Sequence, residues 1–210
     1  MSCLRGLSTD IVGLSETNAC WSHPHLRSDF HSATRRFYKQ SKVSFGSPTR
    51  QIDPCSQSDT FQAGGNLTLI TGFMTSRVTG QTSIEDSTGL GRWCGVTLEG
   101  KDGCLLTIIT AYRVCHGSPS TAPLGSSFLR EYEFLRSTKS SSVNPRRRFL
   151  SDLQSAIHDL QALDHSIILM LDANSTMDSD AHFSDFISAC GLNDAHSQDP
   201  APSTYIGSAT

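Results

Sequence analysis

Three short apolar segments, each followed directly by polar side chains, constrain this chain more than any other feature. Each segment has the composition of a buried β-strand, and its polar residues come where such a strand would end. Side chains at strand ends can face one shared cleft, so we expect these groups to lie together. The segments are Asp10–Leu14, followed by Glu16; Cys104–Val114, which closes with Tyr112 and Arg113; and Ser166–Leu171, followed by Asp172 and Asn174.

The remaining pattern predicts both strands and helices. Two further strands are followed by turn signals or hairpin-like turns rather than by helices, which favours a mixed, layered α/β fold over a doubly wound one. Apolar spacings of three and four predict amphipathic helices, and the segment from Trp21 to Ser58 is irregular. The expected strands are Leu67–Ile70 and Gly91–Leu98, and the expected helices are Ser28–Tyr38, Phe128–Leu135, Arg146–Leu163 and His182–Cys190.

Length and composition set the class of protein. The chain has 210 residues, of which 37% are hydrophobic and 18% charged, which suits one folded domain and excludes a disordered chain. Its longest apolar run, Ile167–Leu171, has five residues, far below the roughly 20 that a membrane-spanning helix needs. The N-terminus has no apolar stretch of signal-peptide length. We therefore expect an intracellular protein, nuclear or cytoplasmic, without a membrane partner.

Cysteine count and charge limit the possible sites. Seven scattered cysteines without a C-x-x-C pair argue against a zinc knuckle and predict reduced, mostly buried thiols, among them Cys94, Cys104 and Cys115. The net charge of −3 is not that of a protein that grips nucleic acid by phosphate contacts alone. Nucleic-acid binding would need a local basic surface or a metal site. The Arg146-Arg147-Arg148 run is expected to be a solvated helix face, although cations oppose the dipole at a helix start.

Together, the strand-end residues could bind a metal ion and a phosphate group. Magnesium prefers hard oxygen ligands and is often held by one or two carboxylates together with substrate phosphate, which Glu16 and Asp172 could supply. Asn174 could orient a nucleophile, because its amide both donates and accepts hydrogen bonds. Tyr112 and Arg113 could bind phosphate oxygens. Each residue also has a plainer interpretation, as a turn, packing or surface group.

Taken in order, the strand ends resemble motifs of the metal-dependent endonuclease/exonuclease/phosphatase (DNase I-like) family. The string DIVGLSETN resembles the family's strand ending in Glu, and IITAYRV resembles its strand ending in Tyr. The string IILMLDAN resembles its strand ending in Gly-Asp-x-Asn, with Leu171 in place of the Gly. The flanking strings GLGRW and NPR resemble endonuclease domains of retroelement and reverse-transcriptase-linked proteins. The resemblance covers Asp10 to Ile206, and three motifs in order are fairly specific.

The resemblance implies a fold and an activity. The fold would be α/β, with two packed mixed β-sheets flanked by helices, a DNase I-like sandwich. The activity would be hydrolysis of a phosphodiester with Mg²⁺ or Mn²⁺, with DNA nicking as the reaction and nucleic acid as the partner. Residue by residue, it implies a metal role for Glu16, a phosphate contact for Tyr112, and positioning of the attacking water by Asp172 and Asn174.

The sequence also departs from the family pattern. Read as a single domain over residues 1–210, it lacks the family's first strand with its Asn, and the C-terminal Asp and Ser-Asp-His motifs. A further acid follows the Asp-x-Asn motif in some members, and Asp178 and Asp180 are equal candidates here. We therefore expect an incomplete sandwich that has lost strands. Two alternatives stay open: an inactive remnant that only binds nucleic acid or a protein, and a phosphatase acting on a small phosphate ester.

Overall fold

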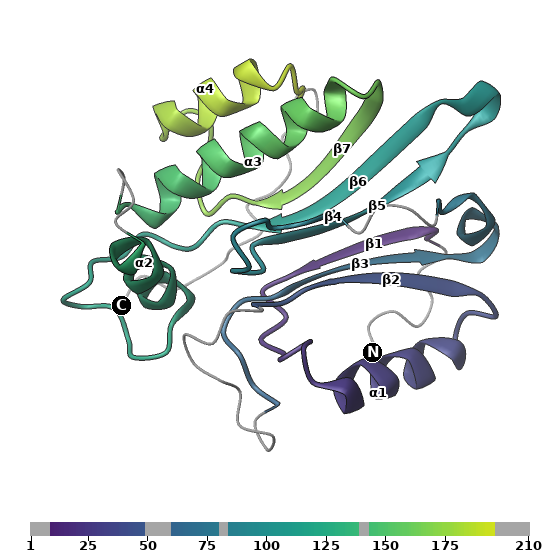
Figure 1. The fold of residues 1–210 in the computed structure, drawn as a ribbon, viewed down its shortest axis with the longest axis horizontal. Helices are drawn as coiled ribbons and strands as arrows, with labels where there is room; N and C mark the ends of the chain where they lie inside the picture. Colours follow the sequence, from purple (N-terminus) through teal and green to yellow (C-terminus); the bar gives the residue numbers. More distant parts are fainter. Residues whose placement is uncertain (1–8, 49–59, 80–83, 139–142, 196–210) are drawn as a thin grey trace.

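Two β-sheets pack face to face in the computed structural model, with helices on their outer faces (Figure 1). The structure describes residues 9–48, 60–79, 84–138 and 143–195. Within these residues, the expected α/β class with two packed sheets and flanking helices is confirmed. No helix in this part of the chain is long and apolar enough to cross a membrane.

One sheet has three antiparallel strands in the order β1-β3-β2. Helix α1 lies on its outer face, where Trp21 and Phe45 form a core with Leu67 and Leu69 that Phe30 of the helix covers. Proline in its first turn suits the start of α1, because the missing N–H would have no partner there. The elements are β1 (Ile11–Ser15), α1 (Pro24–Arg35), β2 (Ser41–Gly46) and β3 (Asn66–Thr71), followed by the 3-10 helix η2 (Gly72–Arg77).

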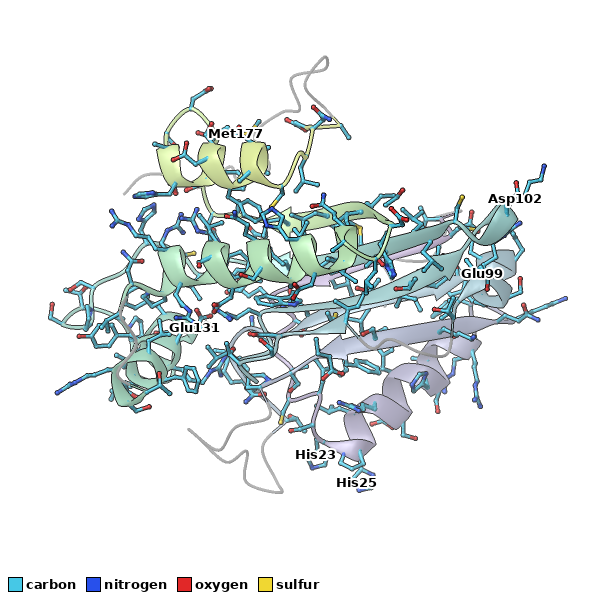
Figure 2. All side chains as sticks on the ribbon, turned by 45° about the horizontal axis from the view of Figure 1, so that its top comes forward. His23, His25, Glu99, Asp102, Glu131 and Met177 are labelled. Carbon is cyan, nitrogen blue, oxygen red and sulfur yellow. The ribbon has the colours of Figure 1, made fainter. Side chains whose placement is uncertain are left out.

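The other sheet has four strands in the order β4-β5-β6-β7. A tight hairpin joins β5 to β6 as antiparallel neighbours, whereas β6 and β7 are parallel and connected by two helices. Figure 2 shows Glu99 and Asp102 at the hairpin and Glu131 toward the opposite end of the molecule. The elements are β4 (Ile84–Glu85), β5 (Trp93–Glu99), the 3-10 helix η3 (Lys101–Gly103), β6 (Leu105–Tyr112), α2 (Ser127–Ser137), α3 (Pro145–Gln161), β7 (His165–Asp172) and α4 (Ala181–Ala189).

Helices α3 and α4 cover the outer face of the four-stranded sheet (Figure 1). The apolar stripe of α3 packs there, with Phe149, Leu153 and Ile157 at most 1% exposed. Ser, Asn and Asp cap the N-termini of α2, α3 and α4: Ser126, Asn144 and Asp180 each accept a hydrogen bond from a backbone N–H three residues on.

The inner faces of the two sheets meet in a core that mixes apolar and threonine side chains. Ile70 of one sheet packs with Ile108 of the other. Thr68 and Thr110 share a buried hydrogen bond of 2.8 Å across the interface, which keeps their hydroxyls satisfied. This packing fixes how the two sheets stack, and it thereby places the ends of strands from both sheets near one another.

The sequence predictions hold for most elements, and three need correction. Strand β2 lies in the segment that the sequence analysis treated as irregular, and α1 begins four residues before the predicted start. The set of reduced, buried thiols is also wrong in part: Cys104 and Cys115 are exposed, and Cys20 is disulfide-bonded. Cys94 and Cys190 are free and buried, as expected.

Candidate active site

The ends of β1, β6 and β7 meet at one end of the sandwich. The parallel pairing of β6 and β7 places Tyr112 opposite Asp172. The hydroxyl of Ser15, the last residue of β1, donates a hydrogen bond of 3.1 Å to the carbonyl of Ala111. Glu16, the next residue, is thereby held beside the end of β6. The three segments identified in the sequence thus contribute to one place in the fold.

Tyr112 and Glu16 are in direct contact. The phenol hydroxyl of Tyr112 donates to Oε1 of Glu16 at 3.1 Å. The tyrosine is 5% exposed, whereas Glu16 is exposed to solvent. Burial, and next the proximity of Cys115 and Glu16, raises the pKa of Tyr112 far above its usual value. Tyr112 therefore remains a neutral phenol, able to donate a hydrogen bond to an anionic oxygen.

A strained turn aims Glu16. Its φ is 51°, in the left-handed region, and Asn18 has the same value. A residue such as glutamate adopts this conformation at a cost of about 1–2 kcal/mol. The turn is held by the backbone of a Gly-Gly segment: Asn18 N–H donates to Gly64 O at 2.8 Å, and Gly64 N–H donates to Asn18 Oδ1 at 3.1 Å. The surrounding contacts thus impose the strain that points Glu16 away from its strand.

Asn174 lies on the other side of the site with its amide oriented by the backbone. Its Nδ2 donates to the carbonyl of Arg113 at 2.7 Å, which leaves Oδ1 to accept a hydrogen bond of 3.3 Å from the thiol of Cys115. The same thiol lies 3.9 Å from the Tyr112 hydroxyl. A continuous chain of contacts therefore runs from Glu16 through Tyr112 and Cys115 to Asn174. Sequence reasoning missed Cys115, although it follows the predicted site strand by one residue.

Asp172 and Glu16, the two carboxylates expected to bind a metal, are both exposed at strand ends. Oδ1 of Asp172 accepts a hydrogen bond of 3.2 Å from the backbone N–H of Asn174. Within the described ranges, no group of three or more His, Cys, Asp or Glu side chains could hold a metal ion. Magnesium commonly takes one or two carboxylates and completes its shell with water and phosphate. A magnesium role for Glu16 and Asp172 stays a prediction.

Arg113 is inside the protein, not on the surface of the site. Its side chain is 2% exposed, and Nη1 lies 2.8 Å from Oδ2 of Asp180. Burial, opposed by the hydrogen bond to Asp180, lowers the pKa of Arg113. A direct contact between Arg113 and substrate stays a prediction. Of the two acids that the sequence could not tell apart, Asp180 is the one engaged here, while Asp178 is exposed.

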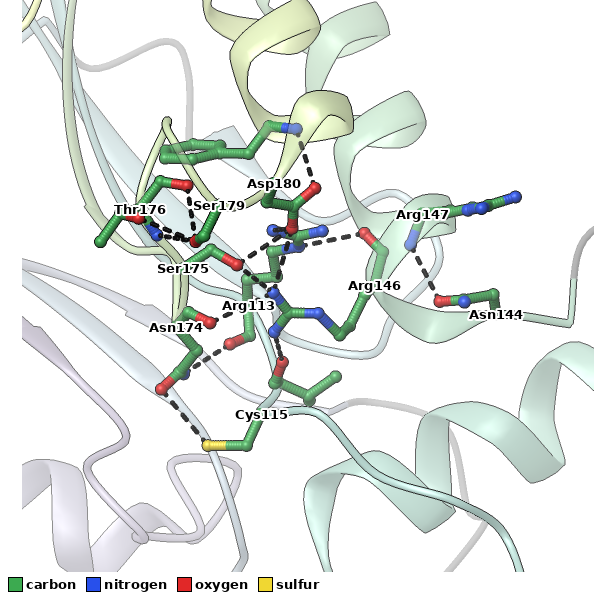
Figure 3. Close-up of polar contacts among 12 residues, drawn as sticks. Arg113, Cys115, Asn144, Arg146, Arg147, Asn174, Ser175, Thr176, Ser179 and Asp180 are labelled. Atoms are coloured by element: carbon green, nitrogen blue, oxygen red, sulfur yellow. Dashed lines mark hydrogen bonds and ion pairs between the residues drawn. The ribbon is translucent and has the colours of Figure 1, made fainter.

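Arg146 is a second residue that sequence reasoning placed wrongly. It is 4% exposed and not part of a solvated face, whereas Arg147 is exposed as predicted. Figure 3 shows Arg146 between Asp180 and the segment that carries Asn174. The available signal was the position of a cation at a helix start, which is locally unfavourable and calls for a tertiary partner.

Comparisons with known proteins identify the fold. No protein-family model matches the sequence, and no curated protein matches it. The structure resembles the human Nocturnin catalytic domain solved with a bound sulfate anion, with a TM-score of 0.54 and 15% identity over 89% of this chain and 59% of that one. This chain therefore spans less than two thirds of that domain.

Two further solved structures are less similar to this chain. They are a Staphylococcus aureus beta toxin, with a TM-score of 0.47, 10% identity and coverage of 90% of this chain and 60% of that one, and the Xenopus laevis APE2 catalytic domain, with a TM-score of 0.47, 16% identity and coverage of 83% and 53%. At these sequence identities, structural similarity indicates a shared fold and nothing more. The two packed sheets, one antiparallel and one mixed, with helices outside are those of a DNase I-like α/β sandwich.

Proposed function

We propose that this chain is a metal-dependent phosphodiesterase of the endonuclease type, acting on DNA in the manner of retroelement endonucleases. The observation that carries the proposal is the convergence of three strand ends, with the Tyr112 hydroxyl bound to Glu16 and linked through Cys115 to Asn174. Sites of phosphoryl transfer need hard oxygens for a metal, a donor for phosphate oxygens and a group that orients water. This end of the sandwich offers all three.

Each residue has a role in the proposed reaction. Glu16, together with Asp172, would hold Mg²⁺ or Mn²⁺, which would neutralise charge on the phosphoryl oxygens. The single hydroxyl proton of Tyr112, donated to Glu16 in this structure, would turn to a phosphate oxygen when Glu16 binds the metal. Asp172 and Asn174 orient a water molecule for in-line attack on phosphorus. As the water oxygen bonds to phosphorus, the bond to the leaving oxygen breaks; the water loses a proton to solvent, and the leaving oxygen takes one from solvent. Arg113 supports phosphate from behind the site, where its buried ion pair holds it.

A second candidate is a domain that binds nucleic acid or a protein without cutting. The absence, among the described residues, of a group of three metal-binding side chains favours it. A third candidate is a phosphatase that acts on a small phosphate ester, since the same donors would serve a monoester. The three candidates differ in what they hydrolyse and bind, so one set of assays separates them.

The decisive experiment is a plasmid-nicking assay with the purified chain. It compares magnesium with EDTA, and the wild type with Asp172→Ala. Asp159→Ala is a matched control, because it removes an exposed carboxylate from α3. We expect nicking that requires the metal, falls about 10²-fold or more in Asp172→Ala and is unchanged in Asp159→Ala.

The other outcomes point to the other candidates. A folded chain that does not nick, yet retards a labelled duplex in a salt-dependent manner, would support the binding domain. Hydrolysis of p-nitrophenyl phosphate without nicking would support the phosphatase. Nicking that survives both EDTA and Asp172→Ala would contradict the proposed site.

A further inference from the structure

The loop between β7 and α4 carries the site residues. Hydrogen bonds within it join Thr176 to Ser179 and Asp180, whereas those of Asn174 go to residues outside the loop. The loop runs from Ala173 to Asp180, and Thr176 to Ser179 are exposed. Asn174 adopts a left-handed conformation with φ of 46°. A solvent-exposed loop of this kind is ordinarily mobile, whereas a site needs its groups held within fractions of an ångström. Contacts from outside the loop must therefore set the position of Asn174.

Arg146 of α3 provides those contacts (Figure 3). Its Nη2 donates to the carbonyl of Asn174 at 3.2 Å and to Oγ of Ser175 at 2.6 Å. Its Nη1 donates to the carbonyl of Val114 at 2.5 Å. One planar guanidinium thus ties the loop to the chain that leaves β6. A lysine could not reproduce this, because its single ammonium lacks the fixed fork of donors.

Asp180 provides the counter-charge for this arrangement. Its Oδ2 lies 2.8 Å from Arg113 and 3.4 Å from Arg146, and it also accepts from Oγ of Ser175 at 3.0 Å. The carboxylate is largely buried, with a side chain 12% exposed. Buried charge-assisted hydrogen bonds of this kind are strong and geometrically specific. The loop is therefore held at both ends, at Asn174 and at Asp180.

We infer that Arg146, with Asp180 as its counter-ion, is a positioning residue that holds Asn174 so that its Oδ1 meets the Cys115 thiol. Its catalytic consequence rests on the proposed function, but the positioning itself does not. If Arg146 is altered, the carbonyl of Asn174 loses its partner and the loop moves. The hydrogen bond from the Cys115 thiol to Asn174 is then lost.

The thiol of Cys115 offers a readout that is independent of activity. It is exposed and donates a hydrogen bond to Asn174, so release of the loop removes the bond that holds the proton on the sulfur and makes the thiol more reactive. We would measure the rate of iodoacetamide labelling at Cys115 by peptide mass spectrometry in the wild type and Arg146→Lys. Arg147→Lys is the matched control, because it makes the same change at the next, exposed residue. We expect about fivefold faster labelling in Arg146→Lys, the effect of losing one hydrogen bond, and no change in Arg147→Lys.

A second variant and a kinetic test complete the experiment. Ser175→Ala removes one partner of Arg146 with little risk to folding, and should accelerate labelling in the same direction. Where the wild type nicks DNA, Arg146→Lys should lower kcat with KM nearly unchanged, which a general loss of folded protein would not do. Unchanged labelling in folded Arg146→Lys and Ser175→Ala would overturn the inference. If the wild type does not nick DNA but Arg146→Lys is still labelled faster than the wild type, the proposed function is overturned and the positioning role of Arg146 stands.

Discussion

Two buried clusters in this molecule join arginines to carboxylates in opposite arrangements. In the first, Arg92 contacts Asp86 at 2.6 Å and Asp152 at 2.8 Å. In the second, Arg113 and Arg146 share the single carboxylate of Asp180. In the first cluster one buried arginine lies between two carboxylates, whereas in the second one carboxylate lies between two buried arginines.

The two arrangements differ in whether a group near physiological pH can gain or lose a proton and so change the charge of the cluster. Beside the first cluster lies Glu131 of α2, whose pKa is raised to about 8 by burial, opposed by Arg92 and Arg130 and assisted by Asp86 and Asp152 (Figure 2). A carboxylate can take up a proton, whereas a guanidinium cannot release one in a protein. In the first cluster, which we interpret as scaffold, Glu131 can therefore change the total charge by taking up or releasing a proton. The second keeps a positive charge directly behind the candidate active site.

The largest effect should come from removing the arginine of the scaffold cluster. Arg92→Leu leaves Asp86 as an uncompensated charge with a side chain 0% exposed. We expect the free energy of unfolding to fall by about 3–5 kcal/mol, measured by urea denaturation followed by circular dichroism. Arg147→Leu, at an exposed arginine, is the control. A loss below about 1 kcal/mol would mean that the cluster is not a scaffold.

Stability should depend on pH through Glu131. Its folded-state pKa of about 8 lies above the ordinary 4.5, so stability is full below pH 4.5 and declines as the pH rises toward 8. Glu131→Gln should match the wild type near pH 4.5 and exceed it by about 2–4 kcal/mol at pH 9. Glu133→Gln, on the exposed side of the same helix, should leave the pH profile unchanged. Parallel profiles for the wild type and Glu131→Gln would refute the charge difference between the clusters.

The second cluster should lose stability as the pH falls, the opposite of the pH dependence expected from Glu131. Its arginine contacts hold the pKa of Asp180 well below the usual value, against the effect of burial. The stability that Asp180 adds is therefore present above pH 3.8 and is lost as the pH falls through the lower folded-state value. We expect Asp180→Asn to reduce the free energy of unfolding by about 1.5–3 kcal/mol at pH 7. The difference from the wild type should shrink in strong acid, and a constant difference would count against the ion pair.

The smallest effect should come from the exposed rim of the scaffold cluster. Arg148 pairs with Asp152 at 2.7 Å along one face of α3, but its side chain is 35% exposed. We expect Arg148→Gln to cost less than about 0.5 kcal/mol and to be insensitive to pH between 6 and 9. A cost comparable with that of Arg92→Leu would show that burial is not what separates strong pairs from weak ones in this cluster.

Much of the fold could be predicted from local pattern. The apolar run of β6 and the stripe of α3 appear within a few residues of their predicted bounds, because strand and helix periodicities depend on neighbours in the sequence. Strand β2 was missed because Ser41, Lys42 and Ser44 interrupt its apolar pattern. Its pairing with β3 supplies what its own sequence lacks.

The candidate site could be predicted only in part. The positions of Glu16, Tyr112 and Asp172 at strand ends followed from the sequence, and the structure places all three at strand ends. Cys115 and Arg146 were misjudged, because exposure of a thiol and burial of an arginine are decided by what packs against them. The burial of Arg146 had only the weak signal of a cation at a helix start, and the exposure of Cys115 had none.

The sequence by itself determined which segments become strands and helices and which polar groups follow them, since those properties arise between residues a few positions apart. Only the tertiary structure decided that Tyr112 lies opposite Asp172 across a parallel pair and that Tyr112 binds Glu16. It alone also decided that Arg146 holds the loop of Asn174. The partners in each of these contacts are between 28 and 96 positions apart in the chain. Contacts at such separations form only when the sheets and helices pack, and their energies depend on the burial that packing creates.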